Sequence, residues 1–241
     1  MDLGIEGRTA LVVAASRGLG RATAEALANE GVRVMLSSRD EESLADARAS
    51  IEAAGGEAAA RPADISDPSA PAELVAATVE AFGTVDIVIA NAGGPPAGHA
   101  LEVDDSQIDA ALEANLKSAI RLIGAAVPIM RSNGWGRICC ITSYSVVQPL
   151  PGLALSNMAR AGLWAWAKTA AQDLAAEGHG VTLNLLCPGP HATDRMRELG
   201  GSGAMGSPED FGQVATFLCS NQAAFINGAA LVIDGGATLA L

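Results

Sequence analysis

Short apolar runs alternate with amphipathic helical patterns along the chain, and this alternation constrains its fold more than any other feature. The apolar runs predict strands at 9–14, 32–36, 85–90, 137–142, 181–186 and 230–233, with a further strand shortly before Asp64. Helical patterns occupy the segments 20–30, 41–54, 71–82, 106–131, 156–177 and 208–220. Strands and helices that alternate in this way predict a doubly wound parallel sheet with helices on both faces, an α/β fold.

Composition favours one domain over the whole chain, residues 1–241. Of the 241 residues, 49% are hydrophobic but only 3% are aromatic, and 27 are glycine. An aliphatic composition of this kind suits helices packed closely on a parallel sheet, and α/β domains of this length usually stay single.

Charge and cysteine content exclude several classes of partner. The formal net charge is −12 and no cluster of Lys and Arg stands out, so a nucleic acid is not expected as a partner. No apolar run reaches transmembrane length, so membrane insertion is not expected either. The four cysteines contain no C-x-x-C pair, and the chain opens with charged residues rather than a signal peptide. We therefore expect a cytoplasmic protein with buried free thiols and no metal site.

A glycine-containing segment, Ala14-Ala15-Ser16-Arg17-Gly18-Leu19-Gly20, follows the first predicted strand and opens the first helix. In open α/β sheets, ligands bind beyond the carboxyl ends of the strands. Backbone N–H groups and the helix dipole at such a place suit a pyrophosphate. The alternative is a plain strand-to-helix turn, since turns also favour glycine.

Further motifs follow the other predicted strands, and together they carry a family resemblance. These are Asp64-Ile65, Asn91-Ala92-Gly93, and Pro188-Gly189 with Thr193. Their order and spacing resemble the short-chain dehydrogenase/reductase family over nearly the whole chain, which implies a single-domain Rossmann-like fold. One departure is visible, because Val13-Ala14 replaces the Thr-Gly that opens the family's glycine loop.

The resemblance also implies a cofactor site. The pyrophosphate loop would be Ala15, Ser16, Arg17, Gly18, Leu19 and Gly20. Asp64 and Ile65 would border the adenine, and Asn91, Ala92 and Gly93 would pack beside the ribose. Pro188, Gly189 and Thr193 would meet the nicotinamide end.

Two arginines favour NADP over NAD. NAD-preferring relatives carry an acidic residue after the second strand, where this chain has Ser38. Arg39 beside it, and Arg17 in the glycine loop, are placed to pair with a ribose 2′-phosphate through their guanidinium groups. The alternative for Arg39 is a solvated surface charge near Asp40.

The catalytic residues match the family only in part. The family uses a serine, a tyrosine, a lysine and an asparagine. Ser143 and Asn115 match the first and last, whereas Ser156 and Arg160 stand in the places of the tyrosine and the lysine. Their spacing of four residues puts both on one helical face. A serine is shorter than a tyrosine and a weaker acid, and arginine cannot pass a proton.

Two further residues have open roles. Tyr144, the single tyrosine of the chain, is either another proton donor or a packing residue. His191, in the loop after Pro188-Gly189, either contacts substrate or lies exposed like His99 and His179.

The pattern as a whole predicts an NADP-dependent oxidoreductase with an atypical active site, acting on a carbonyl or alcohol, and most similar to 3-oxoacyl-carrier-protein reductases. The segment 194–207 is short for the family and rich in glycine, so it is expected to cover the site incompletely, which favours a bulky or carrier-tethered substrate over a tightly enclosed small one. The expected partner is a small-molecule or carrier-tethered carbonyl compound. The first alternative is a catalytically silent NADP-binding sensor or assembly protein. The second is a non-redox enzyme on the same scaffold, such as the halohydrin dehalogenases, which also carry arginine in the lysine place but keep the tyrosine and lose the glycine loop.

Self-association is also expected. The helices predicted at 106–131 and 156–177 hold too many apolar residues for one buried face, which would leave an exposed patch. The residues concerned are Ile120, Leu122, Ile123, Leu163, Trp164 and Trp166. We expect a homo-oligomer, and the family resemblance implies a tetramer.

Overall fold

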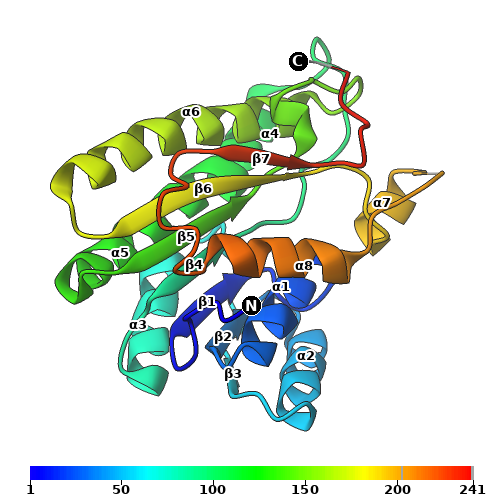
Figure 1. Cartoon of the computed structure of the whole chain (residues 1–241). Helices are drawn as coiled ribbons and strands as arrows, with labels where there is room; N and C mark the ends of the chain where they lie inside the picture. The colour runs from blue at the N-terminus through cyan, green and yellow to red at the C-terminus, as the bar shows by residue number, and fades with distance from the viewer. Residues whose placement is uncertain (202, 240–241) are drawn as a thin grey trace.

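Parallel strands form a single sheet at the centre of the molecule (Figure 1). The computed structural model describes residues 1–201 and 203–239, and in these residues seven strands pair in the order β3-β2-β1-β4-β5-β6-β7. The strands are β1 (Thr9–Val13), β2 (Arg33–Ser37), β3 (Ala58–Ala60), β4 (Ile87–Ala90), β5 (Gly136–Ile141), β6 (Val181–Pro188) and β7 (Ala230–Ile233). Every pair is parallel, so each connection crosses over the sheet and all the strands end at the same edge.

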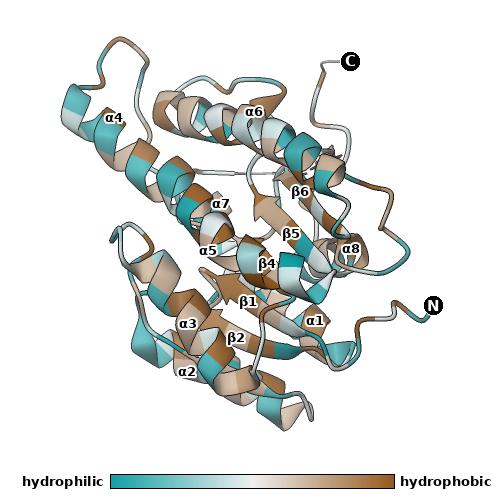
Figure 2. Cartoon of the chain, turned by 90° about the vertical axis from the view of Figure 1, so that its left-hand side faces the viewer, coloured by the Kyte–Doolittle hydropathy of each residue, from teal (hydrophilic) through white to brown (hydrophobic). Residues whose placement is uncertain are grey.

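Helices cover both faces of this sheet, as the alternating pattern predicts. One face carries α1 (Gly18–Asn29), α2 (Glu41–Ala53) and α8 (Pro208–Leu218). The other carries α3 (Ala70–Phe82), α5 (Ser118–Asn133) and α6 (Ala154–Glu177), and α4 (Asp105–Leu112) leads into α5. The short α7 (Asp194–Glu198) follows β6. Figure 2 shows the hydrophobic strands between these helices.

The sheet separates two hydrophobic cores because successive side chains of a strand point to opposite faces. In β1, Leu11 and Val13 enter the core under α3, α5 and α6, whereas Ala10 and Val12 enter the core under α1, α2 and α8. Nearly all of these strand positions are fully buried, which explains why the strands are continuously apolar in the sequence.

The predicted elements agree with the observed ones to within two residues at each end, except in two places. The single helix predicted over 106–131 is divided, because a π-helical turn at Glu113–Lys117 separates α4 from α5. The segment 194–207 contains α7, which the sequence did not predict. The α/β fold class itself is confirmed.

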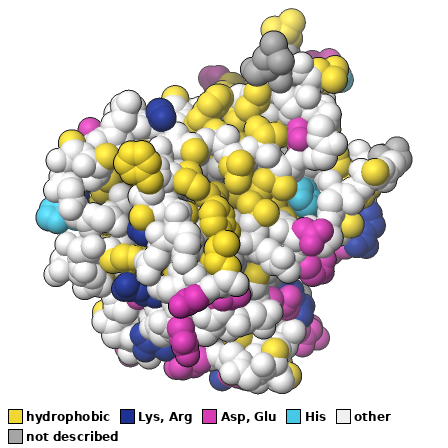
Figure 3. Space-filling model, in the orientation of Figure 1, with side chains coloured by type: hydrophobic (Ala, Val, Ile, Leu, Met, Phe, Trp, Pro, Cys, Tyr) yellow, Lys and Arg dark blue, Asp and Glu magenta, His cyan; other side chains and the backbone are white. Residues whose placement is uncertain are grey.

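Part of the reasoning that predicted an exposed apolar patch is wrong. Leu122, Ile123 and Leu163 are buried within the core of the single chain, and the other three residues are half-buried. Exposed apolar side chains lie instead on the face that carries β7, where Figure 3 shows hydrophobic groups gathered. They include Phe217 of α8, Leu231 of β7 and Phe225 of the segment that connects α8 to β7.

Two other expectations concern cysteines and membrane insertion. All four cysteines are free and buried, as expected of small apolar side chains. Among the helices that the structure describes, none has the length and apolarity needed to span a bilayer.

The strand order reverses between β1 and β4, since the chain runs outward from β1 to β3 on one side and from β4 to β7 on the other. The loops that follow β1 and β4 therefore leave the sheet in opposite directions. A crevice opens between them at the carboxyl edge, where open α/β sheets bind ligands.

Candidate active site

A cleft of about 1040 Å³ lies at this carboxyl edge. Its walls come from the loops after the first four strands and from the adjoining face of α4. It has the size of an ordinary small-molecule or cofactor site. Of the predicted cofactor residues, the cleft is lined by Ser16, Arg17, Ser38, Arg39, Asp64, Ile65, Ala92 and Gly93.

Close packing shapes the glycine loop at the inner end of the cleft. A Cβ added at Gly20 would lie 2.3 Å from the Ala14 carbonyl oxygen and 2.9 Å from Asn91 Nδ2, so only glycine fits there. Ala14 itself has φ +53°, in the left-handed region that favours glycine. Ala14 therefore holds a backbone conformation that glycine adopts more readily.

Arg39 and Ser38 line the part of the cleft that follows β2. Arg39 is exposed, and its charge contributes, after the Ser66 hydroxyl and backbone N–H, to holding the pKa of Asp64 below its ordinary value. Ser38 is buried and its Oγ donates to the Asp40 carbonyl oxygen at 3.2 Å. Arg39 makes no ion pair within the part of the chain that the structure describes.

Arg160 and Ser156 lie on one face of α6, as their spacing predicts. Arg160 is only 8% exposed, and its Nη1 donates to the carbonyl oxygens of Ile141 and Thr142 at 3.0 and 3.1 Å. Its Nε donates to Ser156 Oγ at 3.3 Å. Burial, and then the positive charge of Arg195, lower the pKa of Arg160 to about 10, so the guanidinium stays charged at neutral pH. These bonds anchor α6 to the end of β5.

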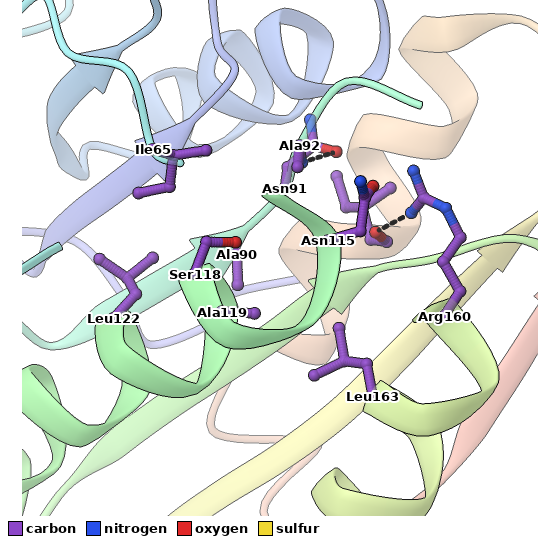
Figure 4. A pocket seen from close by; sticks show the side chains of 11 residues that line it. Ile65, Ala90, Asn91, Ala92, Asn115, Ser118, Ala119, Leu122, Arg160 and Leu163 are labelled. Carbon is purple, nitrogen blue, oxygen red and sulfur yellow. Dashed lines mark hydrogen bonds between the residues drawn. The ribbon is translucent and has the colours of Figure 1, made fainter. Parts of the chain in front are cut away.

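Asn115 faces Arg160 across a small cavity of about 10 Å³ (Figure 4). The π-helical turn at Glu113–Lys117 carries Asn115, and such turns often occur at functional sites. Asn115 is 4% exposed, and its Oδ1 has no hydrogen-bond partner among the described residues. A buried carbonyl oxygen without a partner is costly, so this position is suited to a donor from a bound molecule or water.

Ser143 follows the end of β5 and caps a short 3-10 turn at Tyr144–Val146. Its Oγ accepts the backbone N–H of Ser145 at 3.1 Å, which leaves its own O–H free to donate. Tyr144 is half-buried on that turn. Neither residue contributes to the walls of the cleft or of the small cavity.

The remaining predicted residues lie beside the cleft rather than on its walls. Ala15 is fully buried, and Gly189 packs against Asp234. Thr193 lies near Gly18, with its Cγ2 3.5 Å from a Cβ that would be added there. Its Oγ1 accepts the backbone N–H of Met196 at 3.3 Å and so caps α7. Leu19 and Pro188 also lie outside the cleft walls.

His191 is buried, not exposed. It is 4% exposed, and its Nδ1 lies 3.0 Å from the Gly189 carbonyl oxygen. Its ring packs edge to face against the Phe211 ring, with 5.3 Å between the ring centroids. The exposed-loop alternative is therefore wrong for His191, although His99 and His179 are exposed as expected. The contacts of His191 assign it to packing of the loop after β6.

Two contacts of α7 were not foreseen from the sequence. Arg17 Nη1 of the glycine loop lies 3.8 Å from Asp194 Oδ2, and Arg195 Nη2 donates to the Pro95 carbonyl oxygen at 2.8 Å. They tie the short segment after Thr193 to both walls of the cleft. The expectation of an incompletely covered site rested on length alone and did not include such side-chain contacts.

The left-handed conformation of Ala14 generates a test. Replacing Ala14 with glycine should raise the free energy of unfolding in urea by about 0.5–1 kcal/mol, because the strain of an L-residue at positive φ exceeds the entropic cost of glycine. The matched control is Ala15→Gly at the next, buried residue, whose φ is not positive and which should lose stability. Equal changes in the two variants would contradict the conformational argument.

Comparison with known proteins agrees with this geometry. A family model described as Enoyl-(Acyl carrier protein) reductase matches residues 13–238. Dehydrogenase/reductase SDR family member 4 of Homo sapiens is 30% identical over 243 residues, which cover 95% of this chain and 87% of that protein. The 3-oxoacyl-(acyl-carrier-protein) reductase of Escherichia coli (strain K12) is 31% identical over 245 residues, 97% of this chain and 98% of that protein.

A solved structure extends the likeness to three dimensions. The L-sorbose reductase of Gluconobacter frateurii, complexed with NADPH and L-sorbose, superposes with a TM-score of 0.93 at 28% identity and covers 100% of both chains. A Rossmann-like parallel sheet, its cleft at the strand-order reversal and matches of this length together show that the chain belongs to the short-chain dehydrogenase/reductase family of oxidoreductases, which act on carbonyl and alcohol substrates.

Proposed function

We propose that this protein uses NADP(H) to reduce a carbonyl substrate or to oxidise the corresponding alcohol. Ser156 and Arg160 stand in place of the usual tyrosine and lysine. One observation carries the proposal: the cleft at the carboxyl edge gathers the loops after β1, β2, β3 and β4 around Arg17 and Arg39. Two arginines at this place suit a phosphorylated ribose, because each guanidinium can donate two parallel N–H hydrogen bonds to phosphate oxygens.

The cleft fits a dinucleotide in two further respects. Gly93 has open space on the side where a Cβ would stand, which leaves its backbone accessible to a ribose. The unpartnered Oδ1 of Asn115 stands at the opposite end, where a donor is needed. When bound, NADPH supplies the hydride.

Two serine hydroxyls are the candidates to donate to the substrate carbonyl, and both lie outside the cleft walls. Ser143 Oγ accepts a backbone N–H, and Ser156 Oγ accepts Nε–H of Arg160, so each hydroxyl keeps its own proton to donate. The guanidinium beside Ser156 also stabilises negative charge that develops on that oxygen. Ser143 would polarise the carbonyl, and Ser156 would pass the proton directly or through one water.

The exchange of residues sets the expected rate. Arg160 stays protonated and so does not transfer a proton itself, and serine is a poorer acid than a phenol. Loss of a positioned general acid costs about 10² to 10⁴ in rate, or roughly 3–5 kcal/mol of barrier. We therefore expect a slow reductase whose substrate is a small or carrier-tethered carbonyl compound. The four free thiols support a location in the reducing cytoplasm.

A binding protein without turnover is the second candidate. The observation that favours it is the hydrogen bonding of Arg160, whose Nη1 and Nε already donate to two carbonyl oxygens and to Ser156. A group held in this way serves packing as well as it serves catalysis. Titration with NADPH and NADH, followed by turnover on a panel of ketones and 3-oxoacyl thioesters, separates the candidates. Binding without turnover supports the sensor, and halide release without cofactor supports a non-redox enzyme.

A homo-oligomer, and by family likeness a tetramer, completes the proposal. The support now comes from β7, the last strand of the sheet, which carries the exposed Leu231 and has a strand neighbour on one side only among the described residues. Exposed edges and apolar patches are usually covered by another chain. Sedimentation at micromolar concentration should give a species larger than the 24.3 kDa chain, and a monomer would contradict the proposal.

Cofactor selectivity tests the role of Arg39. Arg39→Asp should weaken NADPH binding by about 1.5–3 kcal/mol and leave NADH binding nearly unchanged, because only NADPH carries the 2′-phosphate. Arg48→Asp is the matched control, since Arg48 is a half-exposed arginine on α2 that pairs with Glu52 outside the cleft walls. Calorimetry measures all four affinities. Equal losses for the two cofactors would show that Arg39 does not read the phosphate.

Restoring the family's residues tests the catalytic proposal. The double variant Ser156→Tyr with Arg160→Lys should raise ketone reduction, by up to about 10² to 10⁴, because it returns a phenol and an amine to the site. Each single variant should gain little, since the phenol and the amine act as a unit. The control is Ser156→Phe with Arg160→Lys, which fills the same volume without the hydroxyl. A folded double variant that binds NADPH but is no faster than this control would end the reductase interpretation.

A further inference from the structure

Arg195 lies beside the cleft and contacts one of its walls. It starts on α7, and its Nη2 reaches the carbonyl oxygen of Pro95 in the loop after β4, 100 residues away in sequence. A Cβ added at Gly94 would lie 3.2 Å from both Nε and Nη2, so the guanidinium rests against the backbone there. Gly94 and Pro95 line the cleft directly beyond the Asn91–Gly93 turn. Arg195 therefore stands beside the part of the cleft that the loop after β4 lines.

The charge around this position is one-sided. Arg195 lies close enough to Arg160 for its charge to depress the pKa of Arg160. Among the described residues, the carboxylate within ion-pair distance of Arg195 is Glu198, 3.6 Å from Nη1, and this exposed pair three residues apart contributes little. No carboxylate of the described chain lies within that distance of the Arg160 guanidinium.

Asp40 and Asp64 line the cleft near Arg17 and Arg39, and two further acids nearby are already in ion pairs. Asp194 lies 3.8 Å from Arg17 and 3.1 Å from Arg197, and Glu113 pairs with Arg121 and with Lys117. In a chain of net charge −12, the guanidinium groups of Arg160 and Arg195 lie near each other, and Glu198 is the carboxylate of the described residues within ion-pair distance of either. Such a pair attracts an anion and repels a cationic ligand.

We propose that Arg195 is a specificity residue for a negatively charged substrate, and that the substrate is a short oxo acid whose carboxylate pairs with the Arg195 guanidinium. This inference rests on the proposed function, since it names the substrate class of the same site. A carboxylate accepts two parallel N–H bonds from a guanidinium and is a stronger acceptor than the Pro95 carbonyl that Arg195 now contacts. Arg195 lies near Arg160, which donates to Ser156, so an acid group held by Arg195 would lie near the Ser156–Arg160 pair.

Oxamate, an unreactive analogue of a 2-oxo acid, and its neutral methyl ester are the probes. Each is titrated by calorimetry into the full chain saturated with NADP⁺. The parent should bind oxamate more tightly than the ester. Arg195→Gln should weaken oxamate at least tenfold and leave the ester within twofold. Arg195→Lys, which keeps the charge but loses the fork, should fall between the parent and Arg195→Gln. Arg197→Gln is the matched control, because Arg197 lies on the same short helix, pairs with Asp194 and is 70% exposed along its side chain.

Three outcomes would overturn the proposal: oxamate binds the parent no better than its ester, Arg195→Gln binds oxamate as well as the parent does, or Arg197→Gln loses as much as Arg195→Gln. The same anion chemistry could come from the cofactor diphosphate, so NADPH affinity is measured for every variant. A loss of NADPH affinity in Arg195→Gln without a loss of oxamate affinity assigns the arginine to the diphosphate and contradicts the substrate assignment. If NADPH does not bind the parent, the proposed function fails, and oxamate titrations on the cofactor-free protein still decide the role of Arg195.

Discussion

Parallel pairing of β1 with β2 on one side and with β4 on the other is the constraint on which the rest of the structure depends. Parallel neighbours require crossover connections. These place helices on both faces of the sheet, so both faces of the strands are buried. The same pairing brings every strand to its carboxyl end along one edge. The strand order reverses between β1 and β4, and this reversal opens the cleft. No catalytic residue is needed to form it. The site is thus a consequence of the sheet, and its chemistry is set by the few residues that follow each strand.

Most of the fold could be predicted from the sequence because burial on both faces makes the strands continuously apolar, and the helices between them repeat at 3.6 residues. Local backbone geometry could not. The π-helical turn around Asn115 interrupts the helix locally, but the apolar periodicity of the sequence continues across it. The periodicity therefore predicts one unbroken helix. The left-handed φ of Ala14 was hidden for a related reason, since alanine gives no signal of positive φ and only the position of the family's glycine hinted at it.

The candidate site was predictable where residues follow strands and unpredictable where side chains reach across the cleft. Arg17, Arg39 and Asp64 lie on its walls because each follows a strand end. Arg195 reaches Pro95, and Arg17 approaches Asp194, only because α7 folds back over the edge of the sheet. Nothing in the spacing of these residues indicates such contacts. His191 shows the converse, since a loop histidine between Pro190 and Ala192 carries no sequence signal that Phe211 will cover it.

The burial of Arg160 links the missing tyrosine to the stability of the fold. A guanidinium that is 8% exposed loses most of its hydration, and here two backbone carbonyls and a serine oxygen replace the water. Ser156 takes part in that replacement, because its Oγ accepts the Nε–H of Arg160. The serine and the arginine are therefore coupled through their shared hydrogen bond as well as through volume. Because buried charge without partners is strongly destabilising, either residue constrains what the other position accepts. Under the proposed function, Ser156 and Arg160 are therefore one paired exchange for the tyrosine and the lysine, and this exchange leaves the site with the same positive charge and less acid strength.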